Sequence, residues 1–253
     1  NGGNDLNAFA VLDGDYYLAA IPPQDANALV RYKAIVTDAT DKNYTYPLTG
    51  DFAYRVLDRA ARIPDVREQL FASGSSAYRG FTVTVSGVVT ATATDIPRDG
   101  TNDAPRIYIQ DGTSPYSGMM LQTTSPEQPL RTVARGTVVR VTGTVDELFG
   151  SYTALTNITD VQTIAQGVNV EPVKVTTASF SGKQRGTPDA EKWENMLVQF
   201  TDVTVVSTNA DGPASNFGEF VISENPAATT GLRVEKDDSN INITNHDVAE
   251  KLQ

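Results

Sequence analysis

Five short apolar runs between residues 81 and 165 constrain the fold of this chain more than any other feature. They are rich in Val, Ile, Thr and Tyr, and clusters of Gly, Pro, Asp and Asn separate them, which is typical of strands joined by turns. The runs are 81–94, 106–111, 118–123, 137–148 and 152–164. Five successive strands suit a small closed barrel better than an open sheet, because closure removes the edges that invite aggregation.

Alternation within the runs predicts which side chains fill this barrel. Ile107 and Ile109 alternate with polar residues in RIYIQD, so they are expected to point inward. Gly87 interrupts the first run, which predicts a bulge or a sharp bend there. The fourth run is expected to place three valines on one face: Val139, Val141 and Val145.

The residues before the barrel predict a separate small β unit and one helix. Runs 15–21, 29–37 and 52–57 read as strands, and 21–27 and 37–47 between them read as turn material. In IPDVREQLFASGSS, Pro64 suits the first helical turn and Ser73-Gly74 supplies a stop. We expect one short helix here, acting as a linker or as a plug under the barrel.

The residues after the barrel repeat part of its pattern. MLVQFTDVTVV resembles TVTVSGVVTAT, GEFVISEN resembles RIYIQDGT, and GLRVE resembles GMMLQ. The offset of roughly 110 residues indicates a duplicated domain and not a short repeat. Nothing after GLRVE resembles TVVRVTGTVDEL, so we expect the second module to be incomplete, with its last strands supplied in cis or in trans.

These patterns predict an all-β chain of four segments. The prediction is a partial small β unit, a helical linker, a five-stranded closed barrel and a partial second copy of that barrel. Their predicted boundaries are 1–58, 59–79, 80–168 and 169–253.

Two sequence stretches resemble a known family. The run from YIQD through RVTGTVDELFGSYTALTNI, and the opening WENMLVQFTDVTV of the second copy, resemble OB-fold modules of secreted bacterial multidomain proteins. Such modules occur beside extracellular nuclease and lamin-tail-like domains. The stretch DGDYYLAAIPPQDANALVRYKAIVTDA is similar to the last strands of an immunoglobulin-like module from the same architectures. The resemblance implies a small five-stranded OB-like barrel, a second partial OB-like module and an N-terminal partial immunoglobulin-like β unit. It also implies a secreted or cell-surface location, and the nuclease motif residues have no counterpart here.

The second strand of the barrel carries the main candidate binding residues. If Ile107 and Ile109 point inward, the alternate residues face outward on a surface with which OB-folds bind oligonucleotides and oligosaccharides. A cation beside an aromatic ring is what a single-stranded chain needs. Residues of the fourth strand and of the turn after it extend this face. The candidate ligand-binding residues are Arg106, Tyr108, Gln110, Arg140, Phe149 and Tyr152.

Two other interpretations of polar residues stay open. Exposed Tyr and Arg are ordinary on strands, where they pack across neighbours, so the face can be purely structural. Asp95, Asp99 and Asp103 lie in one loop and supply oxygen ligands of the kind that calcium prefers. Their spacing departs from the calcium-loop pattern, however, and Asp, Asn, Gly and Pro are also turn formers. No other cofactor is expected.

Composition argues against catalysis. The chain has no Cys, and its one His is His246 near the C-terminus, so thiol nucleophiles and most His-based triads are excluded. A net charge of −11 disfavours a general nucleic-acid coat, and no apolar run approaches membrane-spanning length. We therefore expect a noncatalytic spacer or adhesive scaffold that associates with other domains of the same chain and with itself. The alternative is an accessory module that binds single-stranded nucleic acid or oligosaccharide.

Overall fold

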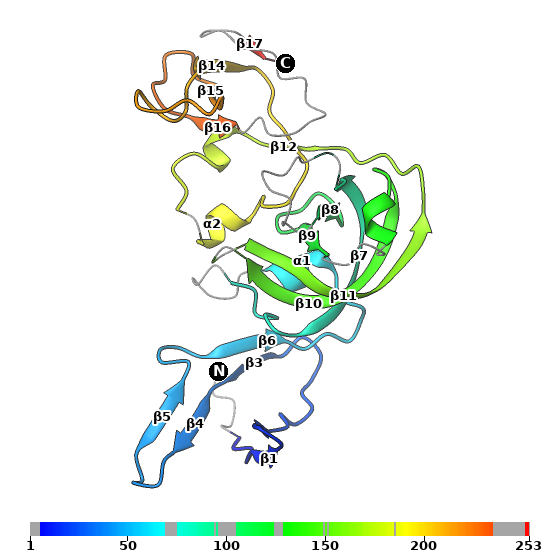
Figure 1. The fold of residues 1–253 in the computed structure, drawn as a ribbon, viewed down its shortest axis with the longest axis vertical. Coiled ribbons are helices and arrows are strands. Elements are labelled where there is room, and N and C mark those ends of the chain that lie inside the picture. Colours follow the sequence, from blue (N-terminus) through cyan, green and yellow to red (C-terminus); the bar gives the residue numbers. More distant parts are fainter. Residues whose placement is uncertain are drawn as a thin grey trace. The chain divides into compact units, whose positions relative to one another are not determined.

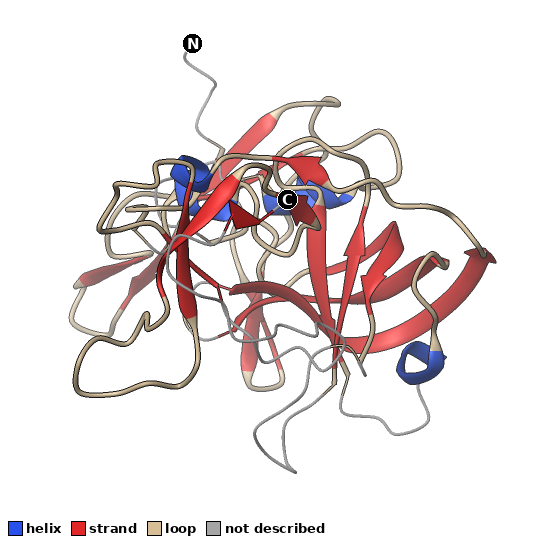
Figure 2. Cartoon of the chain, turned by 90° about the horizontal axis from the view of Figure 1, so that it is seen from above, coloured by secondary structure: helices blue, strands red, loops and turns tan. Residues whose placement is uncertain are grey.

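The computed structural model describes residues 6–68, 75–93, 95, 105–123, 129–148, 150, 152–184, 186–234 and 251–252. It divides into two compact units, 1–59 and 60–253. Strands dominate both, and the helices are few and short (Figure 2), which confirms the all-β class. No helix in the described ranges is both long and apolar enough to cross a membrane.

The first unit consists of three antiparallel strand pairs, β1 with β2, β3 with β6 and β4 with β5. The strands are β1 Val11–Asp13, β2 Tyr16–Leu18, β3 Leu29–Tyr32, β4 Ala34–Thr37, β5 Asn43–Tyr46 and β6 Phe52–Arg55. β5 lies inside residues 37–47, so the prediction of a turn throughout that range is wrong. The β-propensity of Tyr and Thr in NYTY outweighs the turn-forming residues that precede it.

This first unit buries few of its apolar side chains. Among its described hydrophobic residues, only Ala53 is buried. A cluster of rings on the β3–β6 pair gives some packing, with the Tyr32 and Phe52 centroids 5.2 Å apart. Tyr16, Val36 and other apolar side chains of β1, β2, β4 and β5 remain exposed. The unit therefore has strands and rings but almost no core.

The second unit contains a closed five-stranded barrel, visible in Figure 1 as the ring formed by β7 to β11. The strands are β7 Thr82–Ala91, β8 Arg106–Gln110, β9 Gly118–Gln122, β10 Val138–Leu148 and β11 Tyr152–Ala165. They follow the order β7-β8-β9-β11-β10 and close between β10 and β7. All pairs are antiparallel except β9 with β11. All five strands lie within a residue or so of the predicted runs, apart from the end of β7.

The barrel core contains the residues that alternation predicted. Ile107, Ile109 and the three valines of β10 have no exposed surface. The helix α1 (Ile63–Arg67) adds Ile63 and Val66 to the same core. α1 therefore plugs the barrel and belongs to the same compact unit. The 3-10 helix η1 (Pro129–Thr132) adds the buried Leu130.

Gly87 has a different role from the predicted bulge. The register shift of β7 lies between Val89 and Ala91, opposite β8, whereas pairing with β10 runs unbroken through Gly87. A Cβ atom at Gly87 would lie 3.1 Å from both the Gln110 carbonyl oxygen and Ile63 Cδ1. The glycine therefore allows the α1 plug and β8 to approach β7 closely.

The residues after the barrel form short helices and a small sheet. The sheet has the order β16-β15-β14-β17 and contains the three strands that the repeat predicted. A second, parallel pair joins β12 to β13. The elements are β12 Val173–Lys174, η2 Thr177–Ser179, α2 Pro188–Glu191, β13 Val198–Gln199, β14 Val203–Ser207, β15 Phe220–Ser223, β16 Leu232–Val234 and β17 Lys251–Leu252. Val203, Val205, Phe220 and Ile222 form their own core cluster.

Candidate functional site

A segment of the second module lies against the outer face of the barrel. We call residues 188–197 the strap; it begins with α2 and ends just before β13. The Leu197 amide donates to Gln110 Oε1 at 2.8 Å, and Asn195 Nδ2 donates to the Thr153 carbonyl oxygen at 3.2 Å. The strap therefore contacts β8 and β11, two strands of the barrel ring.

The strap also contacts β9 and the turn before it. The Tyr116 amide donates to the Lys192 carbonyl oxygen at 2.7 Å, and the Tyr116 hydroxyl donates to the Pro188 carbonyl oxygen at 2.9 Å. At Gly118, a Cβ atom would lie only 2.3 Å from the Asn195 carbonyl oxygen. The absence of a side chain at Gly118 is what lets the two backbones meet.

Arg67 links the plug helix, the barrel and the strap. Its side chain has no exposed surface. Nη1 donates to the carbonyl oxygens of Gly118 at 2.8 Å and Glu194 at 2.6 Å. Nη2 donates to Glu194 Oε1 at 2.7 Å and more weakly to Glu191 Oε2 at 3.4 Å. The planar guanidinium with its fixed donors is well suited to join several acceptors in one buried place.

Three carboxyl groups surround this single cation. Glu191 and Glu147 are 2% and 7% exposed, and Glu194 contacts the guanidinium directly. Glu147, on β10, accepts hydrogen bonds from the Ser76 amide at 2.7 Å and from the Thr153 hydroxyl at 3.1 Å. Burial raises the pKa of Glu147. Burial also raises the pKa of Glu194 to about 8, with Glu191 and Glu147 adding to the increase and Arg67 opposing it.

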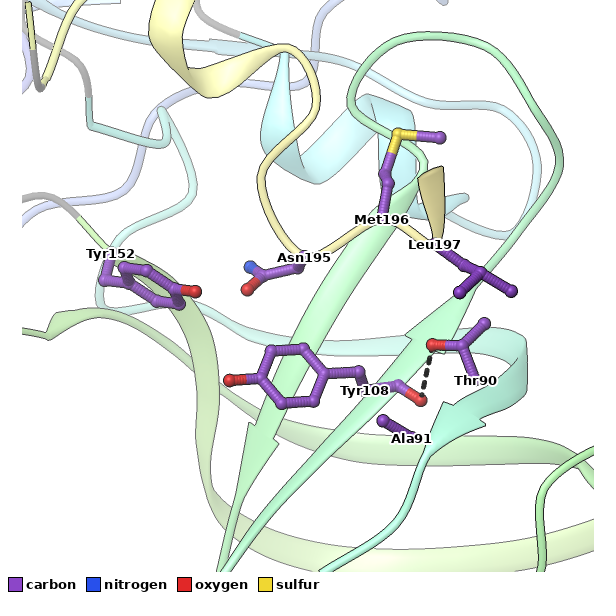
Figure 3. A pocket seen from close by; sticks show the side chains of 7 residues that line it. All are labelled: Thr90, Ala91, Tyr108, Tyr152, Asn195, Met196 and Leu197. Carbon is purple, nitrogen blue, oxygen red and sulfur yellow. Dashed lines mark hydrogen bonds between the residues drawn. The ribbon is translucent and has the colours of Figure 1, made fainter. Parts of the chain in front are cut away.

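A small pocket of about 290 Å³ lies where the strap meets the barrel. In Figure 3 the side chains of Tyr108, Tyr152 and Asn195 point toward one another, and Met196 points away. Asn195 Oδ1 is buried and has no hydrogen-bond partner in the described structure. Burial raises the pKa of both tyrosine hydroxyls, so they stay neutral at ordinary pH. The pocket lining is Thr90, Ala91, Tyr108, Tyr152, Asn195, Met196 and Leu197.

The structure brings together only part of the predicted binding set. Tyr108 and Tyr152 share the pocket, whereas Gln110 is 3% exposed and bonded to the strap. Arg106 is partly buried at the start of β8. Arg140 is exposed on β10, opposite Ser86 and Gln162 and outside the pocket lining. The predicted outward face of β8 therefore points out of the barrel but is largely covered. Phe149 lies outside the described residues.

The proposed calcium loop is described only at Asp95. Its carboxylate accepts hydrogen bonds from the Thr92 amide and from Arg135 Nε, both at 2.7 Å. Asp99 and Asp103 lie outside the described residues, as does His246. Within the described ranges, no group of three His, Cys, Asp or Glu residues is placed to hold a metal ion. Asp95 has the local contacts of a turn residue.

Sequence reasoning missed most of the residues that join the strap to the barrel. Arg67 carried one usable signal, because it follows Ile63 by four residues and so shares the buried face of the helix. Glu191, Glu194 and Asn195 carried none, since a polar run ahead of a predicted strand reads as a loop. Their partners lie 42 or more residues away along the chain.

A scan against protein-family models and a search of curated proteins both find no match for this chain.

Proposed function

We propose that this chain is a noncatalytic scaffold region of a secreted or cell-surface bacterial protein, in which the strap and the barrel form a fixed joint between modules. The observation that carries this proposal is the burial of Arg67 between α1, β9 and the strap, with both of its terminal nitrogens bonded across the joint. The face that OB-folds use for extended ligands is here occupied by the chain itself. A spacer requires such a defined link between successive modules.

The first β unit supports an adhesive role for the scaffold. Its strands present exposed Tyr16, Tyr17, Ile35 and Val36, and exposed apolar surface of this kind marks interaction sites. We propose that this surface takes part in self-association. Sedimentation velocity at increasing concentration checks it: the weight-average mass is expected to rise, and one constant monomer mass would contradict self-association.

The scaffold proposal predicts that the barrel does not bind single-stranded nucleic acid. Three carboxyl groups and the bonded Arg67 lie beside the face, and Arg106 on the face is itself partly buried. Phosphate binding requires available cations. A labelled oligonucleotide titrated at low salt is expected to show no anisotropy change with either the unmodified chain or Tyr108→Ala. Micromolar binding that Tyr108→Ala abolishes, with Tyr44→Ala as an exposed-tyrosine control, would overturn the scaffold proposal.

A second candidate function is binding of a neutral sugar. The pocket combines the rings of Tyr108 and Tyr152 with the buried, unpartnered Asn195 Oδ1. Aromatic rings beside an amide oxygen suit a hydroxyl-bearing ring, and the neighbouring carboxyl groups disfavour a phosphate. Saturation-transfer NMR with oligosaccharides checks this candidate: transfer is expected with the unmodified chain and is expected to disappear in Asn195→Ala. A lack of transfer would remove it.

A further inference from the structure

Among the described residues, the joint between strap and barrel contains more acid than base. Arg67 supplies one positive charge, and Glu147, Glu191 and Glu194 supply three carboxyl groups. With all three ionised, the cluster would hold a net charge of −2 in a region where Arg67 has no exposure. Burying unpaired charge is costly, so such a cluster retains protons instead.

The two strap carboxyl groups are arranged to share a proton. Both contact the same nitrogen of Arg67, at 2.7 Å for Glu194 and 3.4 Å for Glu191, and their side chains hydrogen-bond to each other. A hydrogen bond between two carboxyl groups requires one of them to be protonated. Two carboxyl groups on one buried nitrogen disfavour double ionisation, so the geometry favours a singly protonated pair.

We propose that the strap is a latch that a proton shared between Glu191 and Glu194 holds closed, and that loss of this proton releases the strap from the barrel. This inference rests on the joint proposed above and adds its regulation. Loss of the proton would leave Arg67 facing two carboxylates of the strap, with a third carboxyl group at Glu147, and release relieves this excess of negative charge. It would also expose Gln110, Tyr108 and the rest of the pocket-lining face of the barrel.

The groups that face Glu194 come from every element packed around it. Arg67 from α1 favours its ionised form, and Glu191 from α2 and Glu147 from β10 oppose it. Tyr108 from β8 and Tyr152 from β11 also interact with it. Burial raises the pKa of both tyrosines, so they remain neutral while the carboxyl groups titrate. Two further charged residues of the strap, Lys192 and Asp189, form an exposed ion pair with each other.

The direction of the pH response follows from the protonated state. The pKa of Glu194 is raised from 4.5 to about 8 in the closed joint, and a released strap returns it toward the ordinary value. The closed state therefore binds more protons than the released state between these two values. Closure is strongest at and below about pH 4.5, weakens as the pH rises, and loses this contribution above about pH 8.

The only tryptophan of the chain reports on the strap directly. Trp193 lies between Lys192 and Glu194, so its emission maximum and its quenching by acrylamide follow strap release in the full chain. As the pH rises from 5.5 to 9.5 we expect a red shift and stronger quenching, complete by about pH 8, where the linked contribution to closure ends. The upper limit stays below about 10, the ordinary pKa of a tyrosine side chain, so that most tyrosines remain neutral.

Matched variants assign the transition to the shared proton. Glu194→Gln keeps a neutral hydrogen-bonding group at all pH values, so the transition is expected to disappear and the strap to stay closed. Glu191→Gln is expected to act in the same way, and it provides the same test if Glu194→Gln does not fold. Glu171→Gln, at an exposed position, is expected to reproduce the unmodified curve. A transition that persists in both strap variants with an unchanged midpoint would overturn the latch.

Hydrogen exchange at pH 6 and pH 9, corrected for intrinsic rates, distinguishes failure of the latch proposal from failure of the proposed joint. We expect residues 188–197 to be protected at pH 6 and to exchange at pH 9, with β7 to β11 protected at both. Protection of the strap at both values would overturn the latch and leave the joint standing. Lack of protection at pH 6 would overturn the joint itself. Loss of protection in the barrel together with the strap at pH 9 would also overturn the latch, because the transition would then be global.

Discussion

Two arginines five residues apart show how burial decides the role of a charged side chain. Arg62 pairs with Asp111 at 3.0 Å, but its side chain is 54% exposed. Arg67 is fully buried and contacts the backbone of both β9 and the strap. Exposed ion pairs contribute little because water and salt screen them. Removing one partner from a buried network leaves uncompensated charge behind.

Arg67→Met is expected to lower the free energy of unfolding by about 3–5 kcal/mol, since buried carboxyl groups and three carbonyl oxygens lose their donor. Arg62→Met, the matched control, is expected to cost under about 1 kcal/mol. Urea denaturation followed by circular dichroism at pH 7 measures both. Equal losses in the two variants would contradict the role assigned to Arg67.

At the scale of elements, β9 contributes side chains to the barrel core and also provides the surface against which the strap packs. Gly118, Met119, Met120 and Leu121 are all buried, although only alternate residues of a barrel strand point inward. Met119 and Leu121 belong to the barrel core cluster. The strap backbone lies against Gly118, so this strand has cover on its outer side as well.

Gly118→Ala is expected to displace the strap, because its Cβ would lie 2.3 Å from the Asn195 carbonyl oxygen. Overpacking of this kind costs roughly 1–3 kcal/mol. Stronger acrylamide quenching of Trp193 at pH 6 would report the displacement. Met120→Leu, two residues along the same strand, conserves volume and is expected to leave quenching near its original value. Unchanged quenching in Gly118→Ala would show that the backbones do not meet there.

The elements divide into those that local sequence predicts and those that it does not. The five barrel strands were predictable, because Ile107, Ile109 and the β10 valines alternate along strands that face one core. β5 was missed because Asp41, Lys42 and Asn43 resemble a turn, although the tyrosines that follow pair with β4. The strap was missed for a different reason. Its partners, such as Arg67 at a separation of 127 residues from Glu194, leave no periodic pattern in either segment.

For the whole molecule, the two compact units differ most in how much apolar surface each one buries. The first unit buries Ala53 alone among its described hydrophobic residues. The second has a core cluster that runs from α1 through all five barrel strands. Stability within one chain is not uniform, and segments with few buried contacts open most readily.

Hydrogen exchange of the full chain at pH 6 is therefore expected to show two classes of strand. Amides in β4 and β5, whose side chains are almost all exposed, should exchange at least about a hundredfold faster than those in the barrel strands β7 and β10, because little free energy opposes local opening. Peptide-resolved mass spectrometry measures both. Comparable protection in the two sets would indicate that a partner covers the first unit in solution.

The parallel contact between β9 and β11 has a dynamic consequence. It joins only two residue pairs, Ala154 with Met120 and Leu155 with Leu121, whereas β10 and β7 share seven. Local opening of the barrel is therefore expected to begin where β9 pairs with β11. The strap hydrogen-bonds to Thr153 on β11 and lies against Gly118 on β9. It therefore bridges the two strands of this pairing. Release of the strap is therefore expected to leave the barrel folded while removing a contact that bridges its shortest strand pairing.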